Sequence, residues 1–269
     1  MKLRKKKYII LLISILLVLT LFYSYSYIRY YFSLSSEIHN SKLVLVESSD
    51  EKKFQASIFD TKRIFSSQKI EYFNQFFRDQ LLVVEIPIKN YSFNSLIIKP
   101  IGSDVIQDTS DLYFNTLMFD SNLIAVNGYR NENENTKKIK KLNICINNNG
   151  EIVKNPTRYS SHYKDILQFV EISKMPSKKV RILNYYAFLA IEKNVMYYIS
   201  GTRNSLICWA DVKEFMKLKK IASVFLLDGG TSLEYYFKGV KNTYQFNSIP
   251  LRQFWFPLNS SYFIEGIQR

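Results

Sequence analysis

Glycine, proline, cysteine and histidine are all scarce in this sequence of 269 residues. Its 8 glycines and 6 prolines are too few for a collagen-like or low-complexity chain. The 2 cysteines, Cys145 and Cys208, exclude a zinc-finger array and a disulfide-dense mini-protein, and we expect both to fill buried apolar positions. The 2 histidines exclude any site that needs three of them. Long apolar runs are limited to one, which excludes a multi-span transporter.

That single apolar run follows a basic N-terminal segment. Residues 1–7 contain five Lys or Arg residues, and residues 8–27 contain no charge. A helix of 20 residues is about 30 Å long, which matches the core of a bilayer. The basic cluster before the span indicates a cytoplasmic N-terminus with the rest of the chain outside. The sequence therefore predicts a single-pass cell-membrane protein with a basic tail (1–7), a transmembrane signal anchor (8–27) and a stalk (28–41).

A cleaved signal peptide is the alternative interpretation of this segment. It would require small residues at an A-x-A-like cleavage site soon after the apolar run. Bulky Tyr, Ile and Arg residues separate the nearby serines from one another. This pattern favours an anchor that stays attached.

Residues 42–269 contain short apolar runs rich in β-branched and aromatic residues, which are typical of strands. Two of them flank turn residues and predict hairpins, one around Asn147–Gly150 and one around Lys193-Asn194. No linker rich in Pro, Gly or Ser divides this part of the chain. We expect one extracytoplasmic α+β domain, with a mixed sheet and a few helices.

Two segments show the pattern of a helix followed by a strand. Asp108 can cap a helix that includes residues 112–120, with a strand over 123–128. Trp209, Val212, Phe215 and Met216 recur at helical spacing before an apolar strand over 222–227. If the two strands run parallel in one sheet, Asn127 and Asp228 lie at the same carboxyl edge, where ligands collect in open α/β sheets.

The segment from Asp228 to Ser232 carries the clearest chemical signal. Asp228 ends an apolar strand and precedes the only Gly-Gly pair of the chain, Gly229-Gly230, followed by Thr231 and Ser232. Glycines let backbone amides approach a ligand closely, and successive amides bind anions. A carboxylate at the end of a strand can act as acid, base or nucleophile. The alternative is an ordinary Asp-Gly hairpin turn.

The run from Gly201 to Gly239 resembles the C-terminal signature of the phosphodiester glycosidase family, which includes the lysosomal uncovering enzyme and bacterial exopolysaccharide-associated members. Leu227–Ser232 matches its LDGG turn, and the preceding helix has the expected spacing. A weaker match is Ala125–Gly128, which is similar to a strand that ends in Asn-Gly in the family. The resemblance implies hydrolysis of a sugar–phosphate diester at the anomeric carbon.

The resemblance also implies roles for individual residues. Asp228 would be the catalytic carboxylate, with Asn127 hydrogen-bonding the sugar in the same site. Substrate-binding residues would be Gly128, Arg130, Arg181, Gly229, Gly230, Thr231 and Ser232. No metal-ligating residues are identified, and the sequence leaves the metal requirement and any cofactor open.

Two other functions remain open. Family members carry an arginine at the position of Tyr185, and the closest basic residue here is Arg181. This difference favours a catalytically degenerate member that binds phosphorylated glycan without cleaving it. A structural envelope protein that keeps only the fold is the second alternative.

The charge of the chain agrees with an anionic partner. The net charge is +14, so removing the five basic residues of the tail leaves 14 − 5 = +9. A basic domain attracts phosphate-bearing glycan, lipid or nucleic acid, and a solubilising excess of lysine is the plain alternative. No nucleic-acid-binding motif is present. We expect the partners to be the membrane, through the N-terminal helix, and phosphorylated or anionic surface polysaccharide.

Overall fold

The fold is described from a computed structural model. It describes residues 6–18, 20, 38–50, 54–65, 79–98, 111–116, 141–154, 163–171, 182–202, 205–227, 233–240, 244–245 and 261–269. Residues 6–18 are helical, with the apolar side chains of 8–13 and 15–18 at 49–70% exposure. Among the described residues, no helix has both the length and the apolar content needed to cross a membrane. The remaining residues of the expected anchor, 19 and 21–27, lie outside the described residues.

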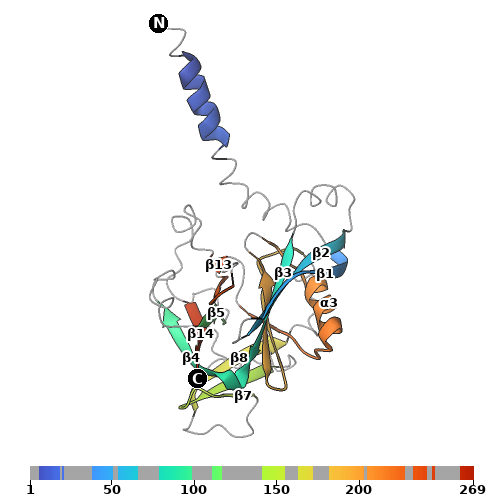
Figure 1. Ribbon diagram of the computed structural model, residues 1–269, viewed down its shortest axis with the longest axis vertical. Coiled ribbons are helices and arrows are strands. Elements are labelled where there is room, and N and C mark those ends of the chain that lie inside the picture. Colours follow the sequence, from blue (N-terminus) through green and yellow to red (C-terminus); the bar gives the residue numbers. More distant parts are fainter. Residues whose placement is uncertain are drawn as a thin grey trace, which may run out of the picture.

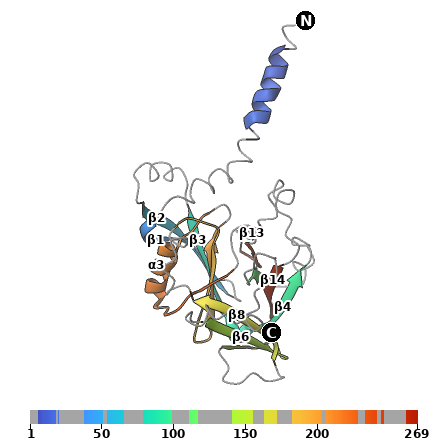
Figure 2. The same ribbon diagram turned by 180° about the vertical axis from the view of Figure 1, so that it is seen from behind.

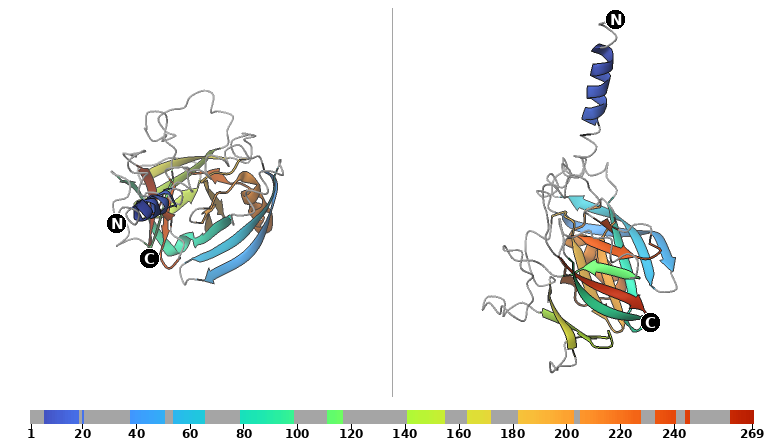
Figure 3. Two further views of the ribbon diagram at one scale, coloured as in Figure 1. Left: turned by 90° about the horizontal axis from the view of Figure 1, so that it is seen from above. Right: turned by 90° about the vertical axis from the view of Figure 1, so that its left-hand side faces the viewer.

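The strands form two sheets, which Figures 1 and 2 show from opposite sides. The larger sheet has the order β1 (Ile38–Asp50), β2 (Gln55–Phe65), β3 (Gln80–Pro87), β10 (Val195–Gly201), β9 (Ala187–Glu192), β11 (Phe225–Leu226), β8 (Tyr163–Glu171), β6 (Lys141–Asn147) and β7 (Ile152–Lys154). The smaller sheet has the order β13 (Tyr244–Gln245), β12 (Glu234–Phe237), β5 (Leu112–Asn115), β14 (Ser261–Gln268) and β4 (Tyr91–Ile98). Figure 3 shows β4, β5 and β14 side by side. All strand pairs in the described part of the chain are antiparallel.

The central strands of the larger sheet are buried on both faces, because they lie between the smaller sheet and helix α3 (Trp209–Lys219). Strand β3 shows this directly. Leu82 and Val84 belong to the core that also contains Phe114 and Phe237 of the smaller sheet, whereas Leu81 and Val83 belong to the core under α3. A nearly continuous apolar run, as in QLLVVEIP of β3, is the sequence pattern of a strand that is covered on both faces. A short 3-10 turn, η1 (Ile88–Asn90), connects β3 to β4.

The expected sheet-dominated domain with few helices is confirmed, with its strands divided between two sheets. Both predicted hairpins are present, as β6–β7 and β9–β10, and the second predicted helix is α3. The helix expected over 112–120 is wrong in its described part, because Leu112–Asn115 forms β5. β5 pairs with β12 and β14, two partners more than a hundred residues further along the chain. These long-range neighbours, and the aromatic residues of β5, outweigh the local capping signal.

Strand β1 begins at Ile38, inside the segment that the sequence assigns to a stalk. Ile38 is 2% exposed and belongs to the core between the sheets, and Ser41 is 6% exposed. Residues 38–41 are therefore part of the folded body.

Candidate functional site

All of the site residues expected from the sequence lie outside the described residues. They are Asp228, Asn127, Gly128, Arg130, Arg181, Gly229, Gly230, Thr231 and Ser232. The strand expected over 123–128 lies outside as well. The structure does describe both flanks of the Asp228–Ser232 segment, and these flanks locate the segment in the fold.

The two flanks of this segment belong to different sheets. Leu227 follows β11 in the larger sheet, and its amide donates a hydrogen bond of 2.9 Å to the carbonyl of Ala187. Leu233 precedes β12 in the smaller sheet. Leu227 and Leu233 are 0% and 2% exposed, so both flanks are anchored in the core. Residues 228–232 are thus the connection between the two sheets. The parallel arrangement considered from the sequence does not hold for β11, whose neighbours β8 and β9 both run antiparallel to it.

Four strands of the larger sheet end or begin at the edge where Leu227 lies. β10 ends at Gly201, opposite Leu81 near the start of β3, while Ser200 pairs with Ala187 at the start of β9. We call this the Gly201 edge, defined by Gln80, Ala187, Gly201, Thr202 and Leu227. The amide of Thr202 donates to the carbonyl of Gln80 at 3.0 Å, which extends the ladder one step beyond β10. The polar segment Asp228–Ser232 therefore begins at an edge with well-defined geometry.

The turn after β10 is packed too tightly for a side chain at Gly201. A Cβ atom there would lie 2.3 Å from the carbonyl oxygen of Ser205. The hydroxyls of Thr202 and Ser205 lie 2.8 Å apart, and Ser205 accepts a 3.1 Å hydrogen bond from the Gln80 amide. Both hydroxyls are buried, at 5% and 3% exposure. The Gly201 edge is therefore lined on this side by small hydroxyl side chains that already have partners.

A group of aromatic side chains lies between the sheets beneath the same edge. The ring of Tyr235 on β12 lies 5.3 Å from that of Tyr198 and 5.9 Å from that of Phe237. The Tyr235 hydroxyl donates to the carbonyl of Gly201 at 2.8 Å. Burial raises the pKa values of Tyr198 and Tyr235 well above the usual value for tyrosine, so both hydroxyls remain protonated. Tyr235 thus acts as a neutral hydrogen-bond donor from the smaller sheet to the larger one.

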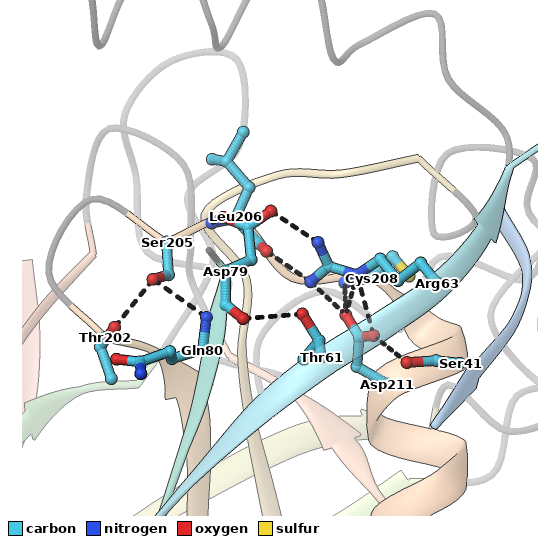
Figure 4. Close-up of polar contacts among 10 residues, drawn as sticks. All are labelled: Ser41, Thr61, Arg63, Asp79, Gln80, Thr202, Ser205, Leu206, Cys208 and Asp211. Carbon is cyan, nitrogen blue, oxygen red and sulfur yellow. Dashed lines mark hydrogen bonds and ion pairs between the residues drawn. The ribbon is translucent and has the colours of Figure 1, made fainter. Parts of the chain in front are cut away.

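A buried charge cluster lies beyond the same edge, where β2 extends past the start of β3 (Figure 4). It contains Arg63 on β2, Asp79 just before β3, and Asp211 in the first turn of α3. The guanidinium lies 2.6 Å from Asp79 and 2.7 Å from Asp211, and the exposure of the three side chains is 0–3%. Arg63 also binds Asp211 through Nε, at 3.0 and 3.1 Å. One arginine therefore joins three separate parts of the chain.

Neighbouring polar groups complete the cluster (Figure 4). Asp211 accepts hydrogen bonds from the Ser41 hydroxyl at 2.5 Å and from the Cys208 amide at 2.9 Å. Leu206 donates its amide to Asp79 at 3.0 Å and accepts from Arg63 at 2.7 Å. Burial alone would lower the pKa of Arg63, but the two carboxylates outweigh burial and raise the pKa above its usual value. The cluster is closed to solvent and internally paired, so its chemistry is structural.

The sequence analysis did not find this cluster. Arg63, Asp79 and Asp211 are separated by 16 and 132 residues (79 − 63 and 211 − 79), and no local motif contains two of them. The one available signal is Asp211 near the start of a predicted helix, where a carboxylate favours the helix dipole.

Both cysteines are buried, as expected from the sequence, and both are free thiols. Burial and the nearby Asp211 carboxylate raise the pKa of the Cys208 thiol, and burial raises that of Cys145. Neither thiol is therefore poised as a nucleophile. Within the described ranges, no three His, Cys, Asp or Glu side chains come together as metal ligands.

Comparison with known proteins yields similarity in structure alone. No family profile matches the chain, and no curated protein matches it. One similar solved structure is the zebrafish N-acetylglucosamine-1-phosphodiester alpha-N-acetylglucosaminidase catalytic domain, auto-inhibited by its pro-peptide. It shares 12% identity at a TM-score of 0.46 over 86% of this chain and 89% of that chain. A hypothetical protein from Synechocystis shares 6% identity at a TM-score of 0.41 over 85% of this chain and 64% of that chain. Similarities of this size do not transfer an activity.

Proposed function

We propose that this protein is a phosphodiester glycosidase-like hydrolase that cleaves glycosyl–phosphodiester bonds of surface polysaccharide. The observation that supports the proposal is the position of the two residues that flank Asp228–Ser232. Leu227 lies at the Gly201 edge of the larger sheet, Leu233 precedes β12 of the smaller sheet, and both are buried. An ordinary hairpin turn would join neighbouring strands of one sheet, whereas this segment joins β11 in one sheet to β12 in the other.

In the proposed reaction, water adds to the anomeric carbon and the bond from that carbon to the phosphate oxygen breaks. The products are a free sugar and a phosphate monoester, which leaves with the second proton of the water. Asp228 stabilises positive charge at the anomeric carbon or transfers the proton. Gly229, Gly230 and Thr231 bind the phosphate through their backbone amides, and Arg130 or Arg181 supplies positive charge.

The remaining proposed contacts concern the sugar and the location of the domain. Asn127 hydrogen-bonds the sugar, Gly128 allows its close approach, and Ser232 caps the turn. We further propose that the helix at residues 6–18 is the start of a membrane anchor, with residues 38–269 on the outer side of the cell membrane. The exposed apolar side chains of this helix support that placement.

A binding protein without catalysis is the second candidate. One specific observation favours it: Tyr185, which stands where family members carry arginine, is 4% exposed and part of the core between the sheets. A buried aromatic residue at that position cannot bind phosphate as an arginine would. In this case the protein binds phosphorylated glycan and releases it unchanged.

The deciding experiment measures hydrolysis of a glycosyl-1-phosphodiester by the full-length chain in detergent. Asp228→Asn should reduce turnover by about 10²-fold or more, because a positioned proton transfer contributes at least that much. Glu47→Gln, an equivalent change at an exposed position of β1, should leave turnover unaltered. Equal turnover by wild type and Asp228→Asn would contradict the assignment of Asp228.

An inactive wild type would call for a binding measurement. Binding to phosphorylated glycan that weakens between 0.05 and about 0.5 M salt, where charge interactions are screened, would identify the binding protein. The absence of binding as well as turnover would leave the structural envelope protein as the remaining candidate.

A further inference from the structure

Strands β1 and β2 present exposed apolar and basic side chains together on the face that lies away from α3. Lys42 on β1 pairs with Lys62 on β2, so the two lysines lie on the same face of the larger sheet. Val44 and Ile64 lie two residues from these lysines along their strands, on the same face, and are 38% and 60% exposed. We call Lys42, Val44, Lys62 and Ile64 the β1–β2 surface.

The opposite face of the same strands is covered by α3. Ser41 and Arg63, the neighbours of the two lysines in the sequence, point to that face and bind Asp211 (Figure 4). On the lysine side, β2 is buried as far as Ile58, which is 7% exposed and belongs to the core between the sheets. Beyond that residue β2 extends past the core. The β1–β2 surface is therefore a sheet face that the core leaves uncovered.

The two lysines of this surface have no counter-ion. Neither Lys42 nor Lys62 forms an ion pair in the described part of the chain. The nearby carboxylate of Asp60 accepts a hydrogen bond of 2.9 Å from the side chain of Gln80. Like charges directly opposite each other in a sheet are destabilising. An anion bound at the two lysines would remove this repulsion.

The surface lies at the end of the sheet where the chain enters it. β1 begins at Ile38, and Ile64 pairs with Asn40 close to that start. Ten residues, 28–37, separate Ile38 from the charge-free run of residues 8–27, and ten residues span at most about 35 Å. With that run anchored in a membrane, as proposed above, the start of β1 is held within this distance of the lipid.

We propose that the β1–β2 surface docks on the anionic lipid surface of the membrane that holds the N-terminal helix. Lys42 and Lys62 bind lipid phosphate groups, while Val44 and Ile64 enter the boundary between headgroups and acyl chains. The surface supplies both contributions to interfacial binding, which are buried apolar area and attraction to anionic lipid. Docking would fix the orientation of the domain relative to the membrane. The inference rests on the proposed anchor and is independent of the proposed hydrolysis.

Leu218 on α3 offers a matched control position. It is apolar and 57% exposed, and lysines stand on both sides of it in the sequence. In contrast to the lysines of the β1–β2 surface, Lys217 and Lys219 are paired with Glu214 and Glu85. Because α3 covers the opposite face of the sheet, a label at Leu218 should stay in water when the β1–β2 surface contacts lipid.

The test uses the full-length protein in phosphatidylcholine vesicles with or without about 30% phosphatidylglycerol, which supplies negative charge. A fluorescent label is attached to Ile64→Cys or Leu218→Cys, since both native cysteines are buried. A quencher carried by the lipid near the headgroup–acyl boundary reports contact. With phosphatidylglycerol, quenching should be about 3-fold stronger at residue 64 than at residue 218, because only residue 64 enters that boundary.

Charge variants in the Ile64→Cys protein test the role of the lysines. Lys42→Gln/Lys62→Gln should lower the ratio of docked to undocked protein about 10-fold or more, since two lysines near anionic lipid are lost. Lys213→Gln/Lys220→Gln removes the same charge from exposed positions on and just after α3 and should change this ratio little. Circular dichroism establishes that all variants fold.

The outcomes distinguish the lipid contact from the anchor. Protein that floats with the vesicles but is quenched equally at residues 64 and 218 would overturn the lipid contact and leave the anchor in place. Protein that does not float with the vesicles would overturn both. Quenching at residue 64 that depends neither on phosphatidylglycerol nor on the two lysines would contradict the binding of lipid phosphate. Shielding of residue 64 from an aqueous quencher, without quenching by lipid, would identify a second copy of the chain as the occupant and overturn the inference.

Discussion

Arg63 illustrates how strongly a single buried charge can affect the stability of a protein. Its side chain is 3% exposed and forms ion pairs with two carboxylates that are 3% and 0% exposed. Burying three charges is costly, so the cluster adds little to stability as a whole when compared with apolar residues of the same volume. Replacing a single residue of the cluster has a larger effect on stability, because the remaining buried charges then lack a counter-ion.

We therefore expect Arg63→Met to lower the free energy of unfolding by about 3–5 kcal/mol, the typical cost of breaking a buried ion pair from one side. Denaturant unfolding followed by circular dichroism measures the difference. Lys217→Met serves as the control, since Lys217 is 62% exposed in its ion pair with Glu214, and it should change stability by less than about 0.5 kcal/mol. Losses of similar size in the two variants would show that the charges of the cluster are solvated.

At the scale of elements, the sequence predicts those helices and hairpins whose structure is determined by residues close together in the chain. The hairpin at Lys193-Asn194 and helix α3 were predictable, since alternation, turn residues and helical spacing are local signals. β5 was not, because its partners β12 and β14 come from the other half of the chain. The cluster of Arg63, Asp79 and Asp211 was not predictable either, because its members are far apart in the sequence. The strands predicted on either side of the Asp228 motif are present as β12 and, over Phe225–Leu226 only, as β11, but their membership of two different sheets is a tertiary property.

The end of α3 provides a test of local backbone strain. Lys220 follows the helix in the left-handed conformation, with φ of 56°, a position that favours glycine. Lys220→Gly should raise the free energy of unfolding by about 0.5–1 kcal/mol, because it removes the steric conflict of the Cβ atom. Lys213→Gly, an exposed position within the same helix, should instead lower it by about 1 kcal/mol. Thermal unfolding of both variants measures the pair, and a loss of stability in Lys220→Gly would contradict the prediction.

At the scale of the whole molecule, the proposed anchor determines where the domain lies. Protease added to intact cells should degrade residues 38–269 and leave a short N-terminal fragment in the membrane. The reason is the basic tail, which holds the N-terminus on the cytoplasmic side. Sequencing of the mature protein should find a start at or near Met1. A soluble form that starts near residue 30 would instead indicate cleavage.

The arrangement of the smaller sheet also affects how the protein is made. Among the strands that the structure describes, β4 has β14 as its only neighbour in that sheet, and residues 99–260 separate the two strands. While the ribosome synthesises those residues, β4 lacks β14, and β5 lacks β14 throughout and β12 until Phe237 has been added. Pairing over such a separation is slow, and an open apolar edge attracts other nascent chains. We therefore expect the nascent chain to be prone to association until translation has passed Ser261, so that added chaperones raise the yield of folded protein.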